Sequence, residues 1–219
     1  TKILISRPDK IGDVVLALHC AKQLKKELPD SKIYLHVSEY TFPLVKNIKF
    51  LDGCIKVGEE IEKYQFDIVV DLMAKFDSAR QYISNQIPVK IGNAARWFSF
   101  IYNRSAIVRR SYAKMNEAEY NWRLVQLVDP QLSNVKLTEA LSIDDFEQVA
   151  TYSHSRPYIV LMPGISVSAK PWSRECWIDL ATALAKNPEI DILFIGGPAE
   201  HNELLELRKA LKEYANVKY

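Results

Sequence analysis

The stretch that decides the fold is Ile3-Leu4-Ile5-Ser6-Arg7-Pro8-Asp9-Lys10-Ile11-Gly12-Asp13-Val14-Val15-Leu16-Ala17-Leu18. Its first three residues are apolar and largely β-branched, which is typical of a strand buried on both faces of a parallel sheet. A polar segment with Pro8 and Gly12 interrupts this pattern, and apolar residues then return at helical spacing from Val14 to Leu28. The order of strand, polar loop and helix is that of the first unit of a doubly wound α/β domain.

The loop after this strand is the first candidate for a functional site. Ligands of open parallel sheets bind beyond the carboxyl ends of the strands, which is where Arg7, Asp9, Lys10 and Asp13 are expected. Asp13 has two interpretations. It can be the N-cap of the helix, because its carboxylate would accept backbone N–H groups and favour the helix dipole. It can also be a general base at the mouth of a cleft, and the two roles are compatible.

Alternating strands and helices continue through the first half of the chain. Further strands are expected at residues 32–37, 54–57, 66–72, 89–92 and 106–108. This alternation predicts a parallel sheet with helices on both faces. After a predicted helix at residues 117–128 the periodicity fades, and polar residues dominate from Gln131 to Arg156. We therefore predict one domain at residues 1–130, a connection at residues 131–156 and a second domain at residues 157–219.

Residues 78–116 contain no acidic residue, and their cations are interleaved with aromatic side chains. The cations are Arg80, Lys90, Arg96, Arg104, Arg109, Arg110 and Lys114. One interpretation is a partly buried amphipathic segment with solvated arginines. The other is a surface for an anionic partner, because arginine binds phosphate well and basic, aromatic segments bind anionic membranes. Nucleic acid is not expected, since the net charge is only +2 and no recognition motif is present.

The second half begins with a continuous apolar strand at Tyr158–Met162, as in a buried parallel sheet. Ser173 is expected to cap the helix after the next loop, with Trp172 and Trp177 in the positions of a hydrophobic staple. Three polar residues come just before this helix, where backbone N–H groups favour an anion; they are Ser166, Ser168 and Lys170. A plain solvated loop is an equally good interpretation of the same residues.

The next strand, at Asp191–Ile195, is followed by Gly196-Gly197-Pro198-Ala199-Glu200. Pro198 suits a first helical turn, and Glu200 complements the dipole of the helix. The glycines permit either a tight turn or the close approach of a ligand to the backbone.

Composition limits the remaining classes of function. The three cysteines are far apart and the four histidines are scattered, so neither a disulfide framework nor a metal site is expected. Apolar runs are too short for a membrane span. We therefore expect a protein of the reducing cytoplasm.

Three stretches together resemble the ADP-heptose:lipopolysaccharide heptosyltransferases of glycosyltransferase family 9. They are the first strand with Gly12-Asp13-Val14, the hydroxyl residues before Lys170-Pro171-Trp172, and Gly196-Gly197-Pro198-Ala199-Glu200. The resemblance implies an α/β protein of the GT-B type, with two Rossmann-like, doubly wound domains. It also implies a metal-independent, inverting glycosyltransferase with no cofactor, for which an ADP-heptose-like nucleotide sugar is the donor substrate.

The resemblance assigns expected roles to individual residues. Asp13 would remove the proton of the acceptor hydroxyl, and the donor phosphates would contact Ser166, Ser168 and Lys170. Glu200 would also contact the donor, with Glu203 as its alternative in register. The first domain would take a lipopolysaccharide core or a lipid-linked glycan as the acceptor. Its candidate acceptor-binding residues are Lys10, Arg96, Arg104, Arg109 and Arg110. Peripheral contact with the cytoplasmic face of the inner membrane is compatible with the basic, aromatic stretch.

The sequence differs from the family at its end. It stops where a strand begins, before an Asp-Ser-Gly-x-x-His-like motif that family members carry, so the second domain is expected to be incomplete. Either the chain is a fragment or it is a degenerate member. The alternative function is that of a non-catalytic, Rossmann-like protein that binds a nucleotide or an anionic glycan.

Overall fold

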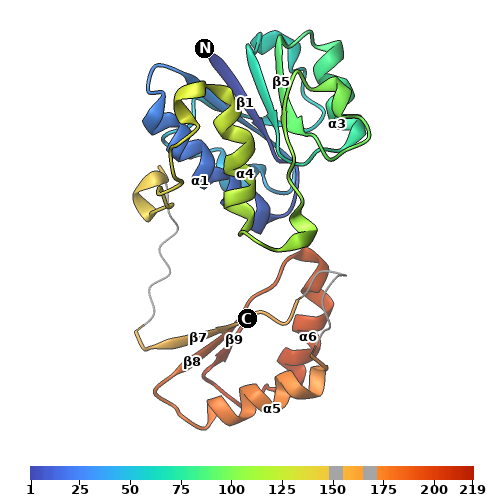
Figure 1. Ribbon diagram of the computed structural model, residues 1–219. Coiled ribbons are helices and arrows are strands. Elements are labelled where there is room, and N and C mark those ends of the chain that lie inside the picture. Colours follow the sequence, from blue (N-terminus) through green and yellow to red (C-terminus); the bar gives the residue numbers. More distant parts are fainter. Residues whose placement is uncertain (148–154, 165–171) are drawn as a thin grey trace. The chain divides into compact units, whose positions relative to one another are not determined.

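The structure is a computed structural model that describes residues 1–147, 155–164 and 172–219. The chain forms two compact units, Thr1–Val149 and Ala150–Tyr219. Each unit is built on a parallel sheet with helices packed against it (Figure 1). The predicted α/β class with two Rossmann-like units is therefore confirmed.

The first unit contains a six-stranded parallel sheet with the order β3-β2-β1-β4-β5-β6. Its strands are β1 (Lys2–Ser6), β2 (Lys32–Val37), β3 (Gly53–Lys56), β4 (Ile68–Asp71), β5 (Val89–Asn93) and β6 (Arg104–Ala106). Ile3 of β1 pairs with Ile33 on one side and with Ile68 on the other. The chain proceeds outward from β1 to β3 and then returns to β4, so the strand order reverses between β1 and β4. The carboxyl ends of strands at such a switch point form a crevice where ligands bind.

Helices and short 3-10 turns connect these strands. The α-helices are α1 (Ile11–Glu27), α2 (Phe42–Val45), α3 (Phe76–Ser84) and α4 (Glu117–Val125). The 3-10 turns are η1 (Glu62–Tyr64), η2 (Ser99–Ile101), η3 (Arg110–Tyr112), η4 (Gln126–Val128), η5 (Pro130–Leu132) and η6 (Ile143–Asp145). The α1 and α4 helices lie side by side (Figure 1).

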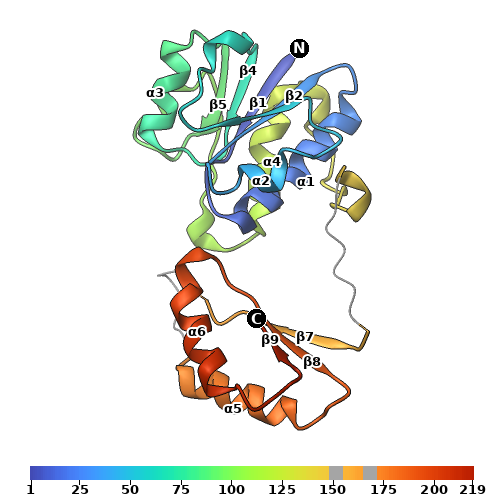
Figure 2. The same cartoon turned by 180° about the vertical axis from the view of Figure 1, so that it is seen from behind.

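Successive residues of β1 point into separate cores, as the alternation of a strand requires. Ile3 and Ile5 pack in the larger core, which α1 and α4 close with side chains such as Leu18 and Leu124. Leu4 packs on the opposite face of the sheet with the Tyr82 side chain of α3. Figure 2 shows this sheet from behind. The sheet is therefore covered on both faces, and this explains why β1 is apolar at every central position.

The strand expected at residues 106–108 lies two residues earlier, as β6. Val108 does not continue the ladder, because both of its backbone groups bond to the Asn93 side chain. The Asn93 amide nitrogen donates to the Val108 carbonyl at 2.7 Å, and its oxygen accepts from the Val108 nitrogen at 3.0 Å. An asparagine at the end of β5 thus replaces the neighbouring strand as the partner of this residue.

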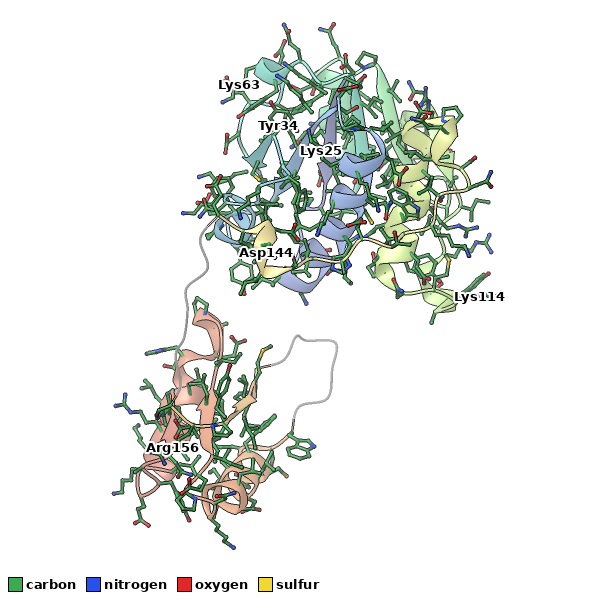
Figure 3. All side chains as sticks on the ribbon, turned by 90° about the vertical axis from the view of Figure 1, so that its left-hand side faces the viewer. Lys25, Tyr34, Lys63, Lys114, Asp144 and Arg156 are labelled. Atoms are coloured by element: carbon green, nitrogen blue, oxygen red, sulfur yellow. The ribbon has the colours of Figure 1, made fainter. Side chains whose placement is uncertain are left out.

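Residues 131–147 pack on the first unit, although the sequence predicted that a connection begins there. Gln23 Oε1 accepts hydrogen bonds from the backbone nitrogens of Thr138 and Glu139 at 2.9 and 3.0 Å. Lys22 forms an ion pair of 2.9 Å with Asp145, next to the Asp144 that is labelled in Figure 3. The contacts are polar and irregular in spacing, so an analysis of hydrophobic periodicity could not detect them.

The second unit has a three-stranded parallel sheet with the order β7-β8-β9. Its elements are β7 (Tyr158–Leu161), α5 (Arg174–Ala185), β8 (Asp191–Phe194), η7 (Pro198–Glu200), α6 (His201–Ala210) and β9 (Val217–Lys218). Ser173 is the N-cap of α5, since its hydroxyl accepts from the Cys176 nitrogen at 3.4 Å. The rings of Trp172 and Trp177 lie 5.3 Å apart, as the predicted staple requires. The predicted cap and staple are confirmed.

Candidate active site

A buried arginine occupies the switch point of the first sheet. Arg7 follows β1 directly, and its side chain is only 6% exposed. Its Nη1 atom donates to the Leu72 carbonyl at 3.0 Å, just beyond the end of the neighbouring β4. A buried guanidinium is stable only when charges and hydrogen bonds compensate for its lost hydration. The surroundings of Arg7 supply both.

Three carboxylates surround the Arg7 guanidinium. Its Nη2 atom lies 2.7 Å from Asp13 Oδ1 and 3.4 Å from Asp9 Oδ2, and its Nη1 atom lies 3.1 Å from Glu117 Oε1. Asp9 belongs to the loop, Asp13 to α1 and Glu117 to α4. Arg7 therefore ties the two helices on one face of the sheet to the carboxyl ends of its central strands.

Asp13 is not the N-cap of α1, so that interpretation is wrong. The helix begins at Ile11, with Lys10 in the N-cap position and no side-chain cap bond, and Asp13 is its third residue. The Asp13 carboxylate instead bonds to Arg7 through Oδ1, while Oδ2 has no hydrogen bond within the described parts of the chain. The side chain is 31% exposed. One oxygen is thus fixed in position, and the other can accept a proton from a hydroxyl outside the protein.

Arg110 extends this network. Its Nε atom lies 2.7 Å from Glu117 Oε1, and its Nη2 atom donates to the Leu72 carbonyl at 3.0 Å and to Asn121 Oδ1 at 3.1 Å. Arg7 and Arg110 therefore share a carboxylate and a carbonyl. Arg110 donates its hydrogen bonds to groups of the protein. It is therefore better suited to hold Glu117 in place than to bind a ligand.

Three of the five predicted acceptor-binding cations line one pocket. The pocket has a volume of about 270 Å³ and lies at the carboxyl end of β5, where Asn93, Arg96, Arg109 and Arg110 contribute to its wall. Arg109 donates to the Tyr112 hydroxyl at 2.7 Å. Arg96 is exposed and forms no ion pair among the described residues. An anion in this pocket would therefore meet at least one guanidinium that is not already neutralised.

The other two predicted acceptor-binding residues lie elsewhere. Arg104 is the first residue of β6, so it lies at the amino end of its strand, whereas the switch-point crevice lies at the carboxyl ends. Its side chain donates to the carbonyls of Leu127 and Val128. It thereby compensates the exposed carbonyls at the end of η4. Lys10 is exposed on the loop before α1, and its backbone nitrogen donates to Asp9 Oδ1 at 3.0 Å. The structure thus separates Arg104 from the pocket arginines.

A buried pair beside the switch point was not predicted. Asp71 ends β4 and is fully buried, and its carboxylate accepts from the Tyr102 hydroxyl at 2.7 Å and from the Ala74 nitrogen at 2.9 Å. Burial raises the pKa of Asp71. Gly92 allows this pairing, because a side-chain carbon there would lie 2.3 Å from the Tyr102 ring. The available signal was an acidic residue at the end of an otherwise apolar strand.

On the donor side, Ser166, Ser168 and Lys170 lie outside the described residues. Glu200 ends η7, and its Oε2 atom accepts from the Gly197 nitrogen at 2.8 Å. A side-chain carbon at Gly164 would lie 2.4 Å from Glu200 Cγ, so the loops after β7 and β8 meet closely at this residue. Glu200 therefore shapes the carboxyl edge of the second sheet, which is where a ligand of that unit is expected.

Metal-ligating groups do not cluster in the described parts of the chain: no three His, Cys, Asp or Glu side chains there could hold an ion together. Within the same residues, no helix is long and apolar enough to cross a bilayer. Metal independence stays a prediction.

Comparison with known proteins gives the family. The family model Glycosyltransferase family 9 (heptosyltransferase) matches residues 54–218, which is most of the chain. The chain belongs to this family, as the motifs predicted. A curated protein of Haemophilus influenzae, which carries a provisional description as a glycosyltransferase, is 24% identical over 97% of this chain and 68% of its own length.

Solved structures of the same kind share the fold. The E. coli ADP-heptose LPS heptosyltransferase II matches with a TM-score of 0.79 at 20% identity, over 100% of this chain and 72% of that one. The E. coli heptosyltransferase WaaC with ADP matches with a TM-score of 0.74 at 18% identity, over 100% of this chain and 74% of that one. These likenesses confirm the predicted GT-B fold.

Proposed function

We propose that the protein is an inverting glycosyltransferase that moves a heptose or a similar sugar from an ADP-sugar to a lipopolysaccharide core acceptor. The observation that carries the proposal is the geometry of Asp13. Its carboxylate lies at the switch point of the first sheet, with one oxygen fixed by a buried arginine and the other without a partner in the described part of the chain. Membership of glycosyltransferase family 9 supports this reaction class.

In the proposed reaction, Asp13 Oδ2 accepts the proton of the acceptor hydroxyl while the hydroxyl oxygen attacks the anomeric carbon of the donor. The new glycosidic C–O bond forms as the bond from that carbon to the diphosphate oxygen breaks. Attack from the face opposite the leaving group inverts the configuration, and the electron pair of the broken bond leaves with ADP. Asp13 then releases the proton to water. The Arg7 contact holds the base in one orientation, which general base catalysis requires.

The pocket lined by Arg96, Arg109 and Arg110 is the proposed site for an anionic group of the acceptor, with Arg96 and Arg109 as its direct partners and Arg110 holding Glu117 beside them. Guanidinium groups suit the phosphates of a phosphorylated core sugar, because their planar forks donate two parallel hydrogen bonds. A lipid-linked glycan with a phosphate would meet the same chemistry. The pocket lies on the same sheet edge as Asp13, since Arg110 contacts both the pocket and the network around Arg7.

The proposed donor is an ADP-heptose-like nucleotide sugar. One related structure, E. coli WaaC, was solved with ADP-2-deoxy-2-fluoro heptose, which supports this choice. Ser166, Ser168 and Lys170 are proposed to stabilise the negative charge that develops on the leaving diphosphate, and Glu200 to contact the donor. The reaction is proposed to need no metal ion and no cofactor, and to take place in the cytoplasm.

The test is a turnover assay of the complete protein with ADP-heptose and a phosphorylated core oligosaccharide. We expect ADP and the extended glycan in equal amounts, an inverted anomeric linkage in the product by NMR, and unchanged rates in the presence of a chelator. Binding of ADP-heptose without any turnover, with this or other glycan acceptors, would contradict the proposal. That result would favour the alternative of a non-catalytic protein that binds a nucleotide or an anionic glycan.

A further inference from the structure

The chain bends sharply after β4, at residues 72–74, and the Asp71 side chain holds this bend. Asp71 Oδ1 accepts hydrogen bonds from the backbone nitrogens of Met73 and Ala74 at 3.2 and 2.9 Å. Ala74 has a φ of +53°, in the left-handed region that residues other than glycine rarely occupy. Such a backbone persists only where its surroundings impose it. The bonds to Asp71 and the burial of Ala74 impose it here. We call residues 72–74 the β4 turn.

The β4 turn presents one carbonyl to both arginines of the candidate site. The Leu72 oxygen accepts from Arg7 Nη1 and from Arg110 Nη2, each at 3.0 Å. A carbonyl oxygen has two lone pairs, and the two guanidinium groups use both. The carboxylates around Arg7 are partly exposed side chains, whereas Leu72 contributes backbone next to a paired strand. The Leu72 carbonyl is therefore the most firmly fixed of these partners of Arg7.

Tyr102 fixes the other oxygen of Asp71. Its hydroxyl donates to Asp71 Oδ2 at 2.7 Å, and the residue is only 6% exposed. The ring lies over Gly92, where a side-chain carbon would come within 2.5 Å of three ring atoms. One oxygen of Asp71 is thus bonded to the β4 turn and the other to Tyr102. The carboxylate cannot rotate without losing one of these bonds.

A buried carboxylate is a costly way to stabilise the end of a strand. Burial raises the pKa of Asp71, which means that the ionised carboxylate is disfavoured at this position. Apolar side chains of similar volume often replace a buried polar pair with little loss of stability. Apolar side chains cannot, however, accept hydrogen bonds from the nitrogens of the β4 turn. The acceptor role of Asp71 towards this turn is therefore what an apolar residue could not supply.

We propose that Asp71 is a positioning residue for the general base. It holds the β4 turn, the Leu72 carbonyl of this turn holds Arg7, and Arg7 holds Asp13 Oδ1 at 2.7 Å. Tyr102 keeps the Asp71 carboxylate in the required orientation. Asp71 is fully buried, so it acts through these contacts and does not touch the substrate. The effect on catalysis rests on the proposed function, whereas the hold on Arg7 does not.

The first test is the turnover rate of variants of the complete protein. Asp71→Ala removes the acceptor of the β4 turn and should lower kcat by about 10- to 100-fold, with little change in donor KM. Asp71→Asn keeps an acceptor oxygen for the turn and should stay within about threefold of the parental kcat. Tyr102→Phe removes one hydroxyl, leaves the core filled and should lower kcat by about fivefold. The matched control is Tyr120→Phe, which removes another buried hydroxyl, bonded to the Lys114 nitrogen at 3.1 Å, and should turn over as the parent does.

A double-mutant cycle separates positioning from a general loss of structure. If Asp71 acts through Asp13, its removal has no base left to misplace once Asp13 is replaced. The Asp71→Ala/Asp13→Asn variant should therefore keep the kcat of Asp13→Asn within about twofold. Tyr102→Phe gives the same comparison if Asp71→Ala does not fold. Losses that multiply in the double variant would overturn the proposal.

The hold on Arg7 can be measured without turnover, by NMR of its side-chain N–H groups in ¹⁵N-labelled protein. The loss of a signal in Arg7→Lys assigns it. Buried, hydrogen-bonded N–H groups exchange slowly with water, so we expect exchange at least about tenfold faster in Asp71→Ala and Tyr102→Phe. Exchange should stay parental in Asp71→Asn and Tyr120→Phe. Parental exchange in Asp71→Ala and Tyr102→Phe would overturn the proposal. If no form turns over while exchange responds as expected, the proposed function is wrong and the hold of Asp71 on Arg7 stands.

Discussion

Arg7 Nη2 lies 2.7 Å from Asp13 Oδ1, at the point where the strand order of the first sheet reverses. The arginine is buried and the carboxylate is partly exposed. This asymmetry gives the two residues different roles. In the proposed reaction Arg7 is a positioning residue, and Asp13 takes the proton of the acceptor. The catalytic proposal depends on this relationship more than on any other contact in the chain.

Substitution of Arg7 should therefore reduce the rate and the stability together. Arg7→Gln removes the cation that holds Asp13 Oδ1 and leaves the Glu117 carboxylate with less compensation. We expect kcat to fall by about 100-fold, as for a displaced catalytic group. The free energy of unfolding should fall by roughly 3 kcal/mol, as for a broken buried ion pair. Turnover kinetics and urea unfolding measure the two effects.

Arg7→Lys is the matched control for this prediction. Lysine keeps the positive charge but cannot donate to Leu72 and Asp13 through a planar fork, so it should recover part of the stability and less of the rate. If Arg7→Gln keeps the parental kcat, Arg7 does not position the base.

The arginine pocket should determine affinity for the acceptor. Replacement of Arg96 and Arg109 by Gln should raise KM for a phosphorylated acceptor by about tenfold, as for the loss of charge-assisted hydrogen bonds, with little change in KM for the donor. Arg104→Gln is the control, because Arg104 bonds to the carbonyls of Leu127 and Val128 outside the pocket. Steady-state kinetics with phosphorylated and dephosphorylated acceptors measures the difference. Equal KM values for both acceptors in the parent would show that the pocket does not recognise the phosphate group of the acceptor.

His36 should make the stability of the first unit depend on pH. Burial lowers the pKa of His36 from its usual value near 6.5 to about 4. The folded protein therefore keeps the ring neutral in a range where the unfolded chain binds a proton. Stability from this group is complete above pH 6.5 and is lost as the pH falls towards 4. Between pH 7 and pH 5 the loss should be about 2 kcal/mol.

The control variant for this effect is His36→Asn, whose amide can still bond to the Ser6 hydroxyl that contacts His36 Nδ1 at 2.9 Å. Urea unfolding at the two pH values gives the loss for each protein. The variant should lose about 2 kcal/mol less than the parent over this range. An equal loss in both proteins would mean that other groups cause the pH dependence.

The parts of the fold that the sequence could predict are those with a regular local pattern. The apolar run at Ile3–Ile5 and the helical spacing after Val14 depend on neighbours in the chain, so β1 and α1 were recognisable. The packing of residues 131–147 on Gln23 and Lys22 was not, because single polar contacts across a long sequence separation leave no period. Irregular segments of this kind require the folded chain.

The candidate site likewise has a part that the sequence could predict and a part that it could not. Asp13 could be identified from the loop before α1, but its role as a cap could not be judged, because capping depends on where the helical backbone begins. The partners of Arg7 come from its own loop, from the residue after β4, from α1 and from α4, and Leu72 is 65 residues away in the sequence. The sheet topology brings these partners together, so no local sequence motif could predict them. Ser166, Ser168 and Lys170 remain predictions from the sequence.

The most direct test of the central claim is the turnover rate of Asp13→Asn in the complete protein. Asparagine can still accept the Arg7 hydrogen bond through its Oδ1 atom, but its amide cannot take a proton from an acceptor hydroxyl. We predict a folded variant whose donor KM is close to the parental value and whose kcat is lower by about 10²- to 10⁴-fold. A folded Asp13→Asn variant that turns over at nearly the parental rate would contradict the assignment of Asp13 as the base.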